Sequence, residues 1–318
     1  MKHLKWYVYS LIAVLAFSAC SSSDDDAETS KVVVNENKNV VSANLPQEVT
    51  RLEFPKVKGD ANNVILVHKT DQYGVNYCTE YDLSKKSQRW SCYEVYKDNN
   101  FKGWTRSQWD GATWMGRTWN GDPFQKDPDV ASDLQTPVSN EYSKSGYDRG
   151  HIVASEDRIY SQDANGQTFF MTNMQPQLHA FNAGIWEDME RQVRNFLTYD
   201  MSTQSSHAQD TLYICKGGTI DSPDQILGYT NGGYIVPKYF FCAVLKKTTQ
   251  GSYQAIGFWF EHKGDYPSSE SLKAHVVNIK KLEELTGLDF FCNLPDDIEK
   301  RVESAPYDPN TLSSKWGF

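Results

Sequence analysis

Basic residues are scarce in this sequence, and the deficit limits the partners that it can attract. Its 318 residues include 32 lysines and arginines against 41 aspartates and glutamates, a formal net charge of −9. An acidic protein does not gain the counterion release that drives bulk binding to nucleic acid. Any site for a polyanion must therefore be a local basic patch, or must take its charge from a metal ion.

Two common patterns of zinc site are also missing. No two of the six cysteines form a CxxC pair, and no two histidines form an HxH or HExxH pattern. Five cysteines follow Cys20, so any disulfide pattern among them leaves at least one thiol unpaired. Cys78 and Cys92 flank a polar segment, where a disulfide between neighbouring strands is one option. The sequence sets no pattern for Cys215, Cys242 and Cys292.

The N-terminal apolar run, Trp6–Phe17, is too short to cross a bilayer as a helix. It follows a basic start and ends at small residues, which is typical of a secretory signal over residues 1–20. The position of Cys20 resembles a bacterial lipobox, whose cysteine becomes lipidated; ordinary cleavage without a lipid is the alternative. We expect an exported outer-membrane lipoprotein, either periplasmic or at the cell surface. Residues 21–50 begin SSSDDDAETS and are expected to form a disordered, acidic and polar tether.

Residues 51–318 are expected to form a single α+β domain. Helical spacing of apolar residues occurs in NAGIWEDMERQVRNFLTYD and in SSESLKAHVVNIKKLEELTG, which Gly287 ends. No internal repeat of domain size is present. Strand-like runs, several of them alternating apolar and polar residues, are VILVHKT, QRWSCYEVYKD, TLYICKGG, GYIVPKYFFCAVLKK and YQAIGFWFEH. We therefore expect a central, largely antiparallel sheet with flanking helices.

Four tryptophans recur at intervals of five: Trp104, Trp109, Trp114 and Trp119. Five is neither a helical nor a strand period, so the segment is expected to be an irregular, aromatic-rich loop. We expect the rings to pack this loop onto the sheet. The alternative is a stacking surface for bases or sugars.

Polar residues gather around two short segments. The tetrapeptide DRGH ends at His151, and an apolar run leads to Asn173 and Gln177. Asn182 then stands at the head of the first amphipathic helix, where it is also a good N-cap. Further along that helix come Glu190 and Arg194, four residues apart and on one face. An amide, a carboxylate and a guanidinium on one helix, beside a histidine, provide what hydrolysis of a phosphodiester requires.

These motifs resemble the DNA/RNA non-specific endonuclease family of the ββα-metal (His-Me finger) superfamily. DRGH is followed by TNMQPQ and then by FNAGIWEDMERQVR, in the order and near the spacing of the family. Upstream, GRTWNGDP resembles the family's R-x-W-x-x-DP segment, and TGLDFFCNLPDDIEKRV resembles its C-terminal segment. The resemblance covers roughly residues 60–308 and implies a ββα-metal motif at the active site.

The resemblance assigns three central roles. His151 matches the general base that activates water, and Asn182 matches the one side chain bound directly to the divalent metal. Glu190 matches the acid that orients a metal-bound water. Because histidine has a pKa of about 6.5, we expect activity to fall below about pH 6 as the imidazole takes up a proton.

The other matched residues surround this centre. Arg117 and Arg194 match arginines near the phosphate, and Asn173 and Gln177 match polar groups that support the site. Arg149 belongs to the DRGH motif, as does Asp148, for which a structural salt bridge would be an equal explanation. The remaining histidines are interpreted as structural, and His179 lies in the turn before Asn182.

The resemblance implies a Mg²⁺-dependent endonuclease that cuts both DNA and RNA with little sequence specificity, with Mn²⁺ as a substitute ion. A single neutral amide ligand suits Mg²⁺, which keeps several waters and prefers oxygen ligands. Two alternatives remain open: a non-catalytic surface binding module on the same fold, and a phosphodiesterase for nucleotide-like small molecules. The membrane contact is expected only through a lipidated Cys20, and the sequence sets no oligomeric state.

Overall fold

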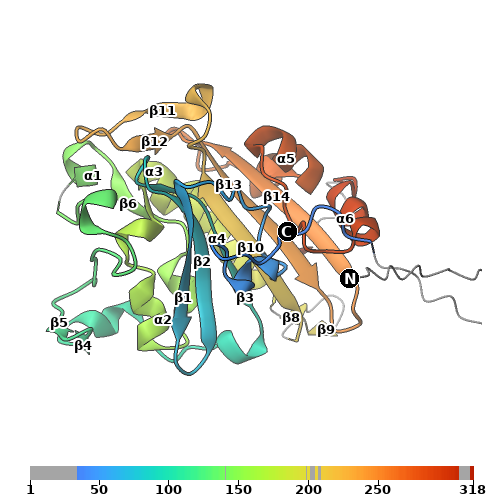
Figure 1. Cartoon of the computed structure of the whole chain (residues 1–318), viewed down its shortest axis with the longest axis horizontal. Helices are drawn as coiled ribbons and strands as arrows, with labels where there is room; N and C mark the ends of the chain where they lie inside the picture. The colour runs from blue at the N-terminus through green and yellow to red at the C-terminus, as the bar shows by residue number, and fades with distance from the viewer. Residues whose placement is uncertain (1–33, 140, 198, 201–204, 207–208, 308–315) are drawn as a thin grey trace, which may run out of the picture. The chain divides into compact units, whose positions relative to one another are not determined.

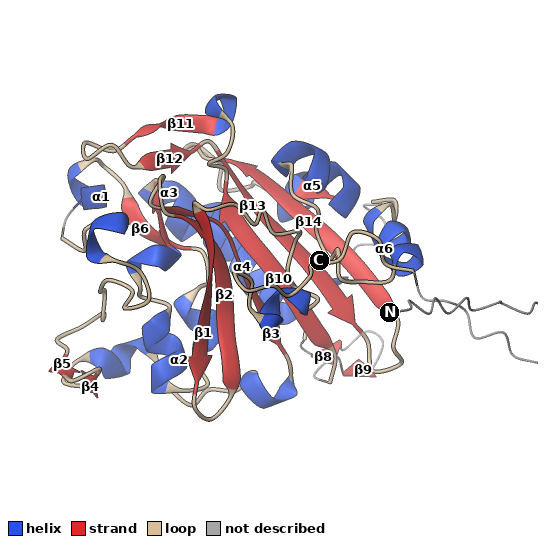
Figure 2. Ribbon diagram, in the orientation of Figure 1, coloured by secondary structure: helices blue, strands red, loops and turns tan. Residues whose placement is uncertain are grey.

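Seven antiparallel strands form one sheet in the computed structural model, which describes residues 34–139, 141–197, 199–200, 205–206, 209–307 and 316–318 (Figures 1 and 2). All six neighbouring pairs are antiparallel. In spatial order the strands are β1 (Asn63–Thr70), β2 (Gly74–Asp82), β3 (Ser87–Val95), β10 (Thr211–Gly218), β13 (Tyr239–Lys247), β14 (Tyr253–Glu261) and β15 (Val276–Val277). The predicted α+β class with a largely antiparallel sheet is confirmed.

Both faces of the central strands are buried, which explains the continuous apolar run of β13. Its side chains at 240, 242 and 244 pack with the helix α4 (Glu187–Asn195), whereas those at 241, 243 and 245 face the opposite way. That second face packs against α5 (Ile279–Thr286) and α6 (Asp296–Glu303). The sheet therefore separates two apolar cores, and only the first of them reaches the DRGH segment.

One long segment leaves the sheet between two neighbouring strands. Val95 at the end of β3 pairs with Leu212 in β10, and residues 96–211 lie between them in the chain. This excursion carries three short strand pairs, and several of its helices lie at the β1 end of the sheet in Figure 1. Its strands and α-helices before the last pair are β4 (Thr113–Trp114), β5 (Arg117–Thr118), α1 (Glu141–Lys144), β6 (Asp148–His151), α2 (Gln162–Gln167), β7 (Met174–Gln177), α3 (His179–Phe181) and α4.

Smaller elements complete the described part of the chain. A strand pair, β8 (Tyr199–Asp200) with β9 (Ser205–Ser206), precedes β10, and another, β11 (Ile226–Tyr229) with β12 (Ile235–Pro237), precedes β13. No helix among the described residues is long and apolar enough to cross a membrane. The short 3-10 turns are η1 (Gln47–Thr50), η2 (Lys97–Asn99), η3 (Arg106–Trp109), η4 (Ser132–Leu134), η5 (Ser155–Arg158), η6 (Met171–Asn173), η8 (Pro223–Gln225) and η9 (Leu272–His275).

The second predicted helix is wrong in its first half. Residues 268–287 contain the turn η9, the short strand β15 and only then α5. The two valines of β15 pair with Gly257 and Phe258 at the edge of the sheet, and β-branched residues favour such a position. The helix begins after Asn278, whose side chain accepts a hydrogen bond from the Lys281 amide at 2.8 Å.

The predicted tether is too long at its C-terminal end. Residues 1–33 lie outside the described residues, but residues 34–50 are packed against the domain. Asn39 is buried and donates from its side chain to the carbonyl oxygens of Val49 and Pro55, and its amide donates to Asn293 Oδ1. The polar composition of this segment reflects side chains that satisfy buried backbone groups, which sequence alone does not distinguish from disorder.

No disulfide joins Cys78 to Cys92. The two residues lie directly opposite each other in β2 and β3, as neighbouring strands would require, yet both are free. Cys215, Cys242 and Cys292 are also free and buried. Burial raises the pKa of the Cys78 and Cys92 thiols well above the usual range, so they behave as small apolar side chains.

The tryptophan-rich loop forms a small core of its own. Trp109, Trp114 and Trp119 are buried together with Phe169 and Phe170. The rings of Trp109 and Trp114 meet edge to face, with centroids 5.5 Å apart. The packing interpretation is therefore confirmed, although the partner of the loop is the segment after α2 rather than the seven-stranded sheet.

Candidate active site

The DRGH segment is the first strand of a strand–strand–helix unit. In β6 and β7, Asp148 pairs with Gln177 and His151 pairs with Met174. The chain then continues through α3 into a wide π-helical turn, η7 (Asn182–Trp186), and on into α4. The indole of Trp186 donates to the carbonyl oxygen of His151 at 3.3 Å and so fixes the strand to the helix.

His151 sits in an aromatic pocket that favours its neutral form. Its ring lies edge to face with Phe169 at 5.0 Å and tilted against Phe124 at 5.8 Å. The Nε2 atom is fully buried and has no hydrogen-bond partner in the described part of the chain. Burial, reinforced by the positive charge of Arg106, lowers the pKa of His151 to about 3. The imidazole is thus uncharged at neutral pH, as a general base must be.

Asn182 faces the same space with its amide oriented by the first residue of DRGH. Its Nδ2 donates to Asp148 Oδ2 at 3.0 Å, and His179 Nδ1 lies 2.9 Å from the same oxygen. Because the amide nitrogen is engaged, the amide oxygen faces away from Asp148, and no described residue binds it. Asp148 therefore orients Asn182, which answers the question that the sequence left open for it.

Four of the predicted residues line one cavity: His151, Asn182, Glu190 and Arg194. Arg106 and Glu187 complete much of its wall. An adjoining cavity of about 290 Å³ shares His151, Asn182 and Arg106 and adds Asp122 and Arg149. The spacing along the helix thus brings the predicted amide, carboxylate and guanidinium to one opening beside the histidine.

A buried ionic network lies beneath this cavity. Lys216 in β10 is buried and contacts Glu190 Oε1 at 3.1 Å and Asp157 Oδ2 at 3.3 Å. Arg194 Nη1 binds the other oxygen of Asp157 at 2.8 Å. Burial raises the pKa of Glu190, and Lys216 opposes this rise by favouring the carboxylate. One oxygen of Glu190 is engaged by Lys216, and the other has no bond to any described residue.

Three arginines lie on aromatic rings near the cavities. The guanidinium carbon of Arg149 is 3.5 Å from the centre of the Phe124 ring, and that of Arg106 is 5.4 Å from the centre of the Phe169 ring. Arg117, predicted near the phosphate, lies over Trp119 at 4.1 Å and lines neither cavity. Arg106, which ion-pairs with Asp122, lines both cavities.

Asn173 and Gln177 line neither cavity: Asn173 holds the backbone by hydrogen bonds, and Gln177 packs beside DRGH. Asn173 is buried, accepts from the Val153 amide at 2.9 Å and donates to the Val153 carbonyl at 2.9 Å. Gln177 packs against Gly150, where an added Cβ would lie 2.2 Å from the Gln177 side chain. Each residue of DRGH thus has a described environment: Asp148 orients Asn182, Arg149 lies on Phe124, Gly150 allows the close approach of Gln177, and His151 lines the cavity.

The comparisons with known proteins agree with this geometry. The family model described as DNA/RNA non-specific endonuclease matches residues 59–297. The chain belongs to this family. A nuclease of Nostoc sp. (strain PCC 7120) is 31% identical over 172 residues, which cover 51% of this chain and 57% of the relative. Mitochondrial endonuclease G of Caenorhabditis elegans is 30% identical over 167 residues, which cover 51% and 53%. The match thus spans just over half the length of these relatives.

A solved structure shares the fold of this family member. It is a chain from the crystal structure of the EndoG/EndoGI complex, with a TM-score of 0.56 and 20% identity. The match covers 73% of this chain and 88% of that chain. At this identity the likeness concerns the fold alone.

Three residues in or around this site were missed by the sequence analysis: Arg106, Lys216 and His262. His262 in the turn after β14 accepts from the Leu178 amide at 2.8 Å through Nε2 and donates from Nδ1 to the Pro237 carbonyl at 2.8 Å. It thereby fixes the chain just before α3. Lys216 offered one clue, since it is the charged residue of the apolar strand TLYICKGG.

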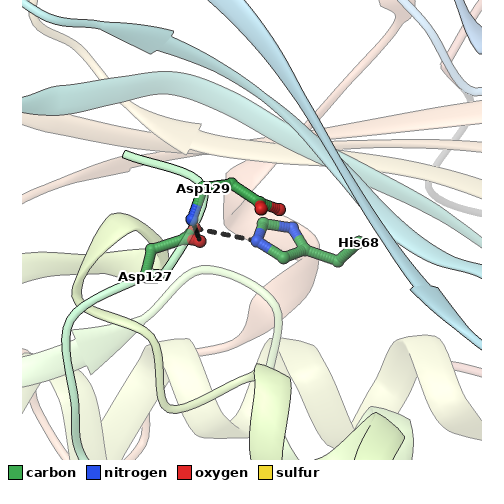
Figure 3. A group of neighbouring side chains, drawn as sticks. All are labelled: His68, Asp127 and Asp129. Carbon is green, nitrogen blue, oxygen red and sulfur yellow. Dashed lines mark hydrogen bonds and ion pairs between the residues drawn. The ribbon is translucent and has the colours of Figure 1, made fainter. Parts of the chain in front are cut away.

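A second histidine holds the loop that follows the tryptophans. His68 Nε2 in β1 lies 2.8 Å from Asp127 Oδ2, and Thr172 donates to the same carboxylate oxygen. Figure 3 shows the Asp129 carboxylate beside the His68 ring. The ring also stacks on Tyr77, with centroids 4.3 Å apart. Through Asp127, His68 thus ties β1 to Thr172 in the chain just before Asn173.

Proposed function

We propose that this protein is a metal-dependent endonuclease that hydrolyses phosphodiester bonds of DNA and RNA with little sequence specificity. One observation carries the proposal: a neutral histidine and an oriented asparagine with a free amide oxygen face the same cavity. Membership of the family supports the reaction class.

The residues present fit a divalent ion of the Mg²⁺ type. Asn182 offers an amide oxygen that no described residue binds, and the unpaired oxygen of Glu190 lines the same cavity. Mg²⁺ prefers oxygen ligands and keeps several waters, so one direct protein ligand suffices, with Glu190 acting through water. When bound, the ion supplies positive charge to the scissile phosphate. Mn²⁺ has a similar preference for oxygen and is the expected substitute.

The protein's own groups provide the remaining chemistry. His151 takes the proton from the attacking water, because its ring is neutral and lines the cavity. Arg194 and Arg106 line that cavity too and are placed to stabilise negative charge that develops on the phosphate.

The local arginines also resolve the difficulty posed by an acidic chain. Arg106 and Arg149 form a basic patch on aromatic rings beside the cavity. Contacts of arginine with phosphates hold the backbone of a nucleic acid but read no base sequence. A site built from such contacts is expected to accept DNA and RNA alike.

The test uses the purified full chain with plasmid DNA and with RNA, in Mg²⁺ or in EDTA. We expect both polymers to shorten in Mg²⁺ and to stay intact in EDTA. His151→Ala should lower turnover by at least ~10²–10⁴-fold, the usual contribution of a positioned base, with an unchanged circular dichroism spectrum.

His275→Ala, outside both cavities, is the matched control and should keep normal turnover. If neither polymer is lost in a metal-dependent way, the proposed function is wrong. If His151→Ala cleaves at a near-normal rate, the role given to His151 is wrong.

We also propose that Cys20 is lipidated after export and anchors the domain at the outer membrane. The support is the sequence of residues 1–20, which lie outside the described residues. Cys20→Ala should move the protein from the membrane fraction to the soluble fraction of cells. Equal membrane recovery of the two proteins would contradict the anchor.

A further inference from the structure

An acidic hollow lies between α5, α6 and the N-terminal residues Glu36 and Asn37. Carboxylates outnumber lysines seven to two among the residues that line it. None of these residues lines the cavities at His151. The nuclease chemistry therefore does not explain why so much negative charge is gathered at this place.

Three carboxylates converge in the hollow from separate segments. Glu283 belongs to α5, Asp289 to the loop that follows it, and Glu303 to the last turn of α6. One oxygen from each lies within 4.8 Å of the others. Ca²⁺ binds oxygens at 2.3–2.6 Å, so ligands on opposite sides of the ion lie up to about 5 Å apart. The three oxygens thus fit around one ion.

Glu303 lacks the partner that burial demands. It is only 8% exposed, and its Oε1 is fully enclosed without a hydrogen-bond partner. A buried oxygen without a donor is costly. Asn37 donates from Nδ2 to Asp289 Oδ2 at 3.1 Å and to Glu299 Oε1 at 2.9 Å, but makes no hydrogen bond to Glu303.

The charge in the hollow is only partly compensated by its own lysines. Burial and the neighbouring carboxylates of Glu283 and Glu299 raise the pKa of Glu303 to about 8. Lys280 contacts Glu283 Oε2 at 3.2 Å, but its side chain is 60% exposed, so solvent weakens this ion pair. No described residue donates to Glu303 or forms an ion pair with it, so the exposed Lys280 only partly compensates the charge of the cluster.

We propose that Glu283, Asp289 and Glu303 form a Ca²⁺ site that joins α5, the loop after it and α6. All three ligands are oxygens, which favours Ca²⁺ or Mg²⁺ over zinc. The irregular set, drawn from two helices and the loop between them, suits the flexible coordination of Ca²⁺ better than the octahedron of Mg²⁺. The affinity expected for such a partly exposed site is on the order of 10⁻⁴–10⁻³ M.

The test measures thermal unfolding of the full chain after removal of metals, with and without CaCl₂. Asn182→Ala serves as the background in a parallel series, because it removes the amide oxygen at the nuclease site. At Ca²⁺ about 100-fold above its Kd, the midpoint should rise by about 5 °C or more in both backgrounds. Glu303→Gln should abolish most of this rise.

The matched control is Glu284→Gln on the same helix, whose side chain is 57% exposed and pairs with Lys281. It should keep the full response to Ca²⁺. Without Ca²⁺, Glu303→Gln should unfold at or above the wild-type temperature, since it relieves repulsion among carboxylates. Asp289→Asn provides a second variant if Glu303→Gln does not fold. No rise in the wild type, or an equal rise in Glu303→Gln, would overturn the site.

Discussion

His262 shows how a residue outside both cavities can make the stability of the fold sensitive to pH. Its two ring nitrogens are committed to opposite roles, one accepting from Leu178 and the other donating to Pro237. Only the neutral ring can do both. Burial accordingly lowers the pKa of His262 to about 4.

The sign of the resulting pH dependence follows from linkage. The unfolded chain binds a proton on this histidine below about pH 6.5, whereas the folded chain resists it down to about pH 4. As the pH is lowered from about 6.5 to about 4, the free energy of unfolding therefore falls by up to about 1.4 kcal/mol per pH unit. His262→Gln should remove this part of the slope in urea unfolding between pH 7 and pH 4.5.

His151 has a pKa shift of the same sign and adds a similar slope in both proteins, so the difference between them isolates His262. Parallel curves for wild type and His262→Gln would show that the two hydrogen bonds do not hold the ring neutral. The low pKa of His151 also changes the expectation for catalysis. A loss of activity near pH 6 would have to come from another group, because His151 stays neutral there.

At the scale of elements, the unit formed by β6, β7 and α4 depends on a lysine from outside it. Lys216 of β10 is the positive charge that contacts both Glu190 and Asp157 in the core. Removing one partner of such a buried network leaves the other charges uncompensated, at a typical cost of about 3–5 kcal/mol.

Lys216→Met should therefore destabilise the protein and raise the pKa of Glu190 further. We expect the acidic limb of the pH–rate profile to move to higher pH, while Lys216→Arg, which keeps the charge, should restore much of its position. Lys247→Met, in the next strand beside Tyr253, is the control and should leave the profile unchanged. A loss of stability without any movement of the profile would make Lys216 a purely structural residue.

Prediction from sequence succeeded where pattern and structure were both local. The runs at 64–70, 211–218 and 253–262 became strands, and the run at 233–247 became β12 and β13. The first amphipathic helix formed because its apolar face has a buried partner in the sheet. Strand β2 was missed, since GVNYCTEYD is buried yet polar at several positions. Glu80, for example, is buried only because Arg89 and Trp90 bind its carboxylate.

The same contrast between local and distant contacts applies to the candidate site. His151, Asn182, Glu190 and Arg194 were predictable together, because one hairpin and one helix place them within a short stretch of chain. Their catalytic roles stay predictions until the variants are measured. Arg106, Lys216 and His262 reach the site from distant segments, and no pattern within a sequence window records a contact of that kind.

At the scale of the whole described domain, the site and the scaffold are separate parts of one chain. The seven-stranded sheet and the helices α5 and α6 form the scaffold, whereas residues 96–211 leave it after Val95 and return at Leu212. Two scaffold residues contact the unit formed by β6, β7 and α4. Lys216 binds Glu190, and His262 accepts from the amide of Leu178.

The pairing of Val95 with Leu212 also has a consequence for how the molecule can change over time. Closing a long loop costs entropy that grows only with the logarithm of its length, about 0.6 kcal/mol for each doubling. Insertions or deletions in residues 96–211 that leave β6, β7 and α4 intact should therefore change the free energy of folding of the sheet only slightly. The segment that carries the candidate site is free to diversify in length while the strands of the sheet keep their register.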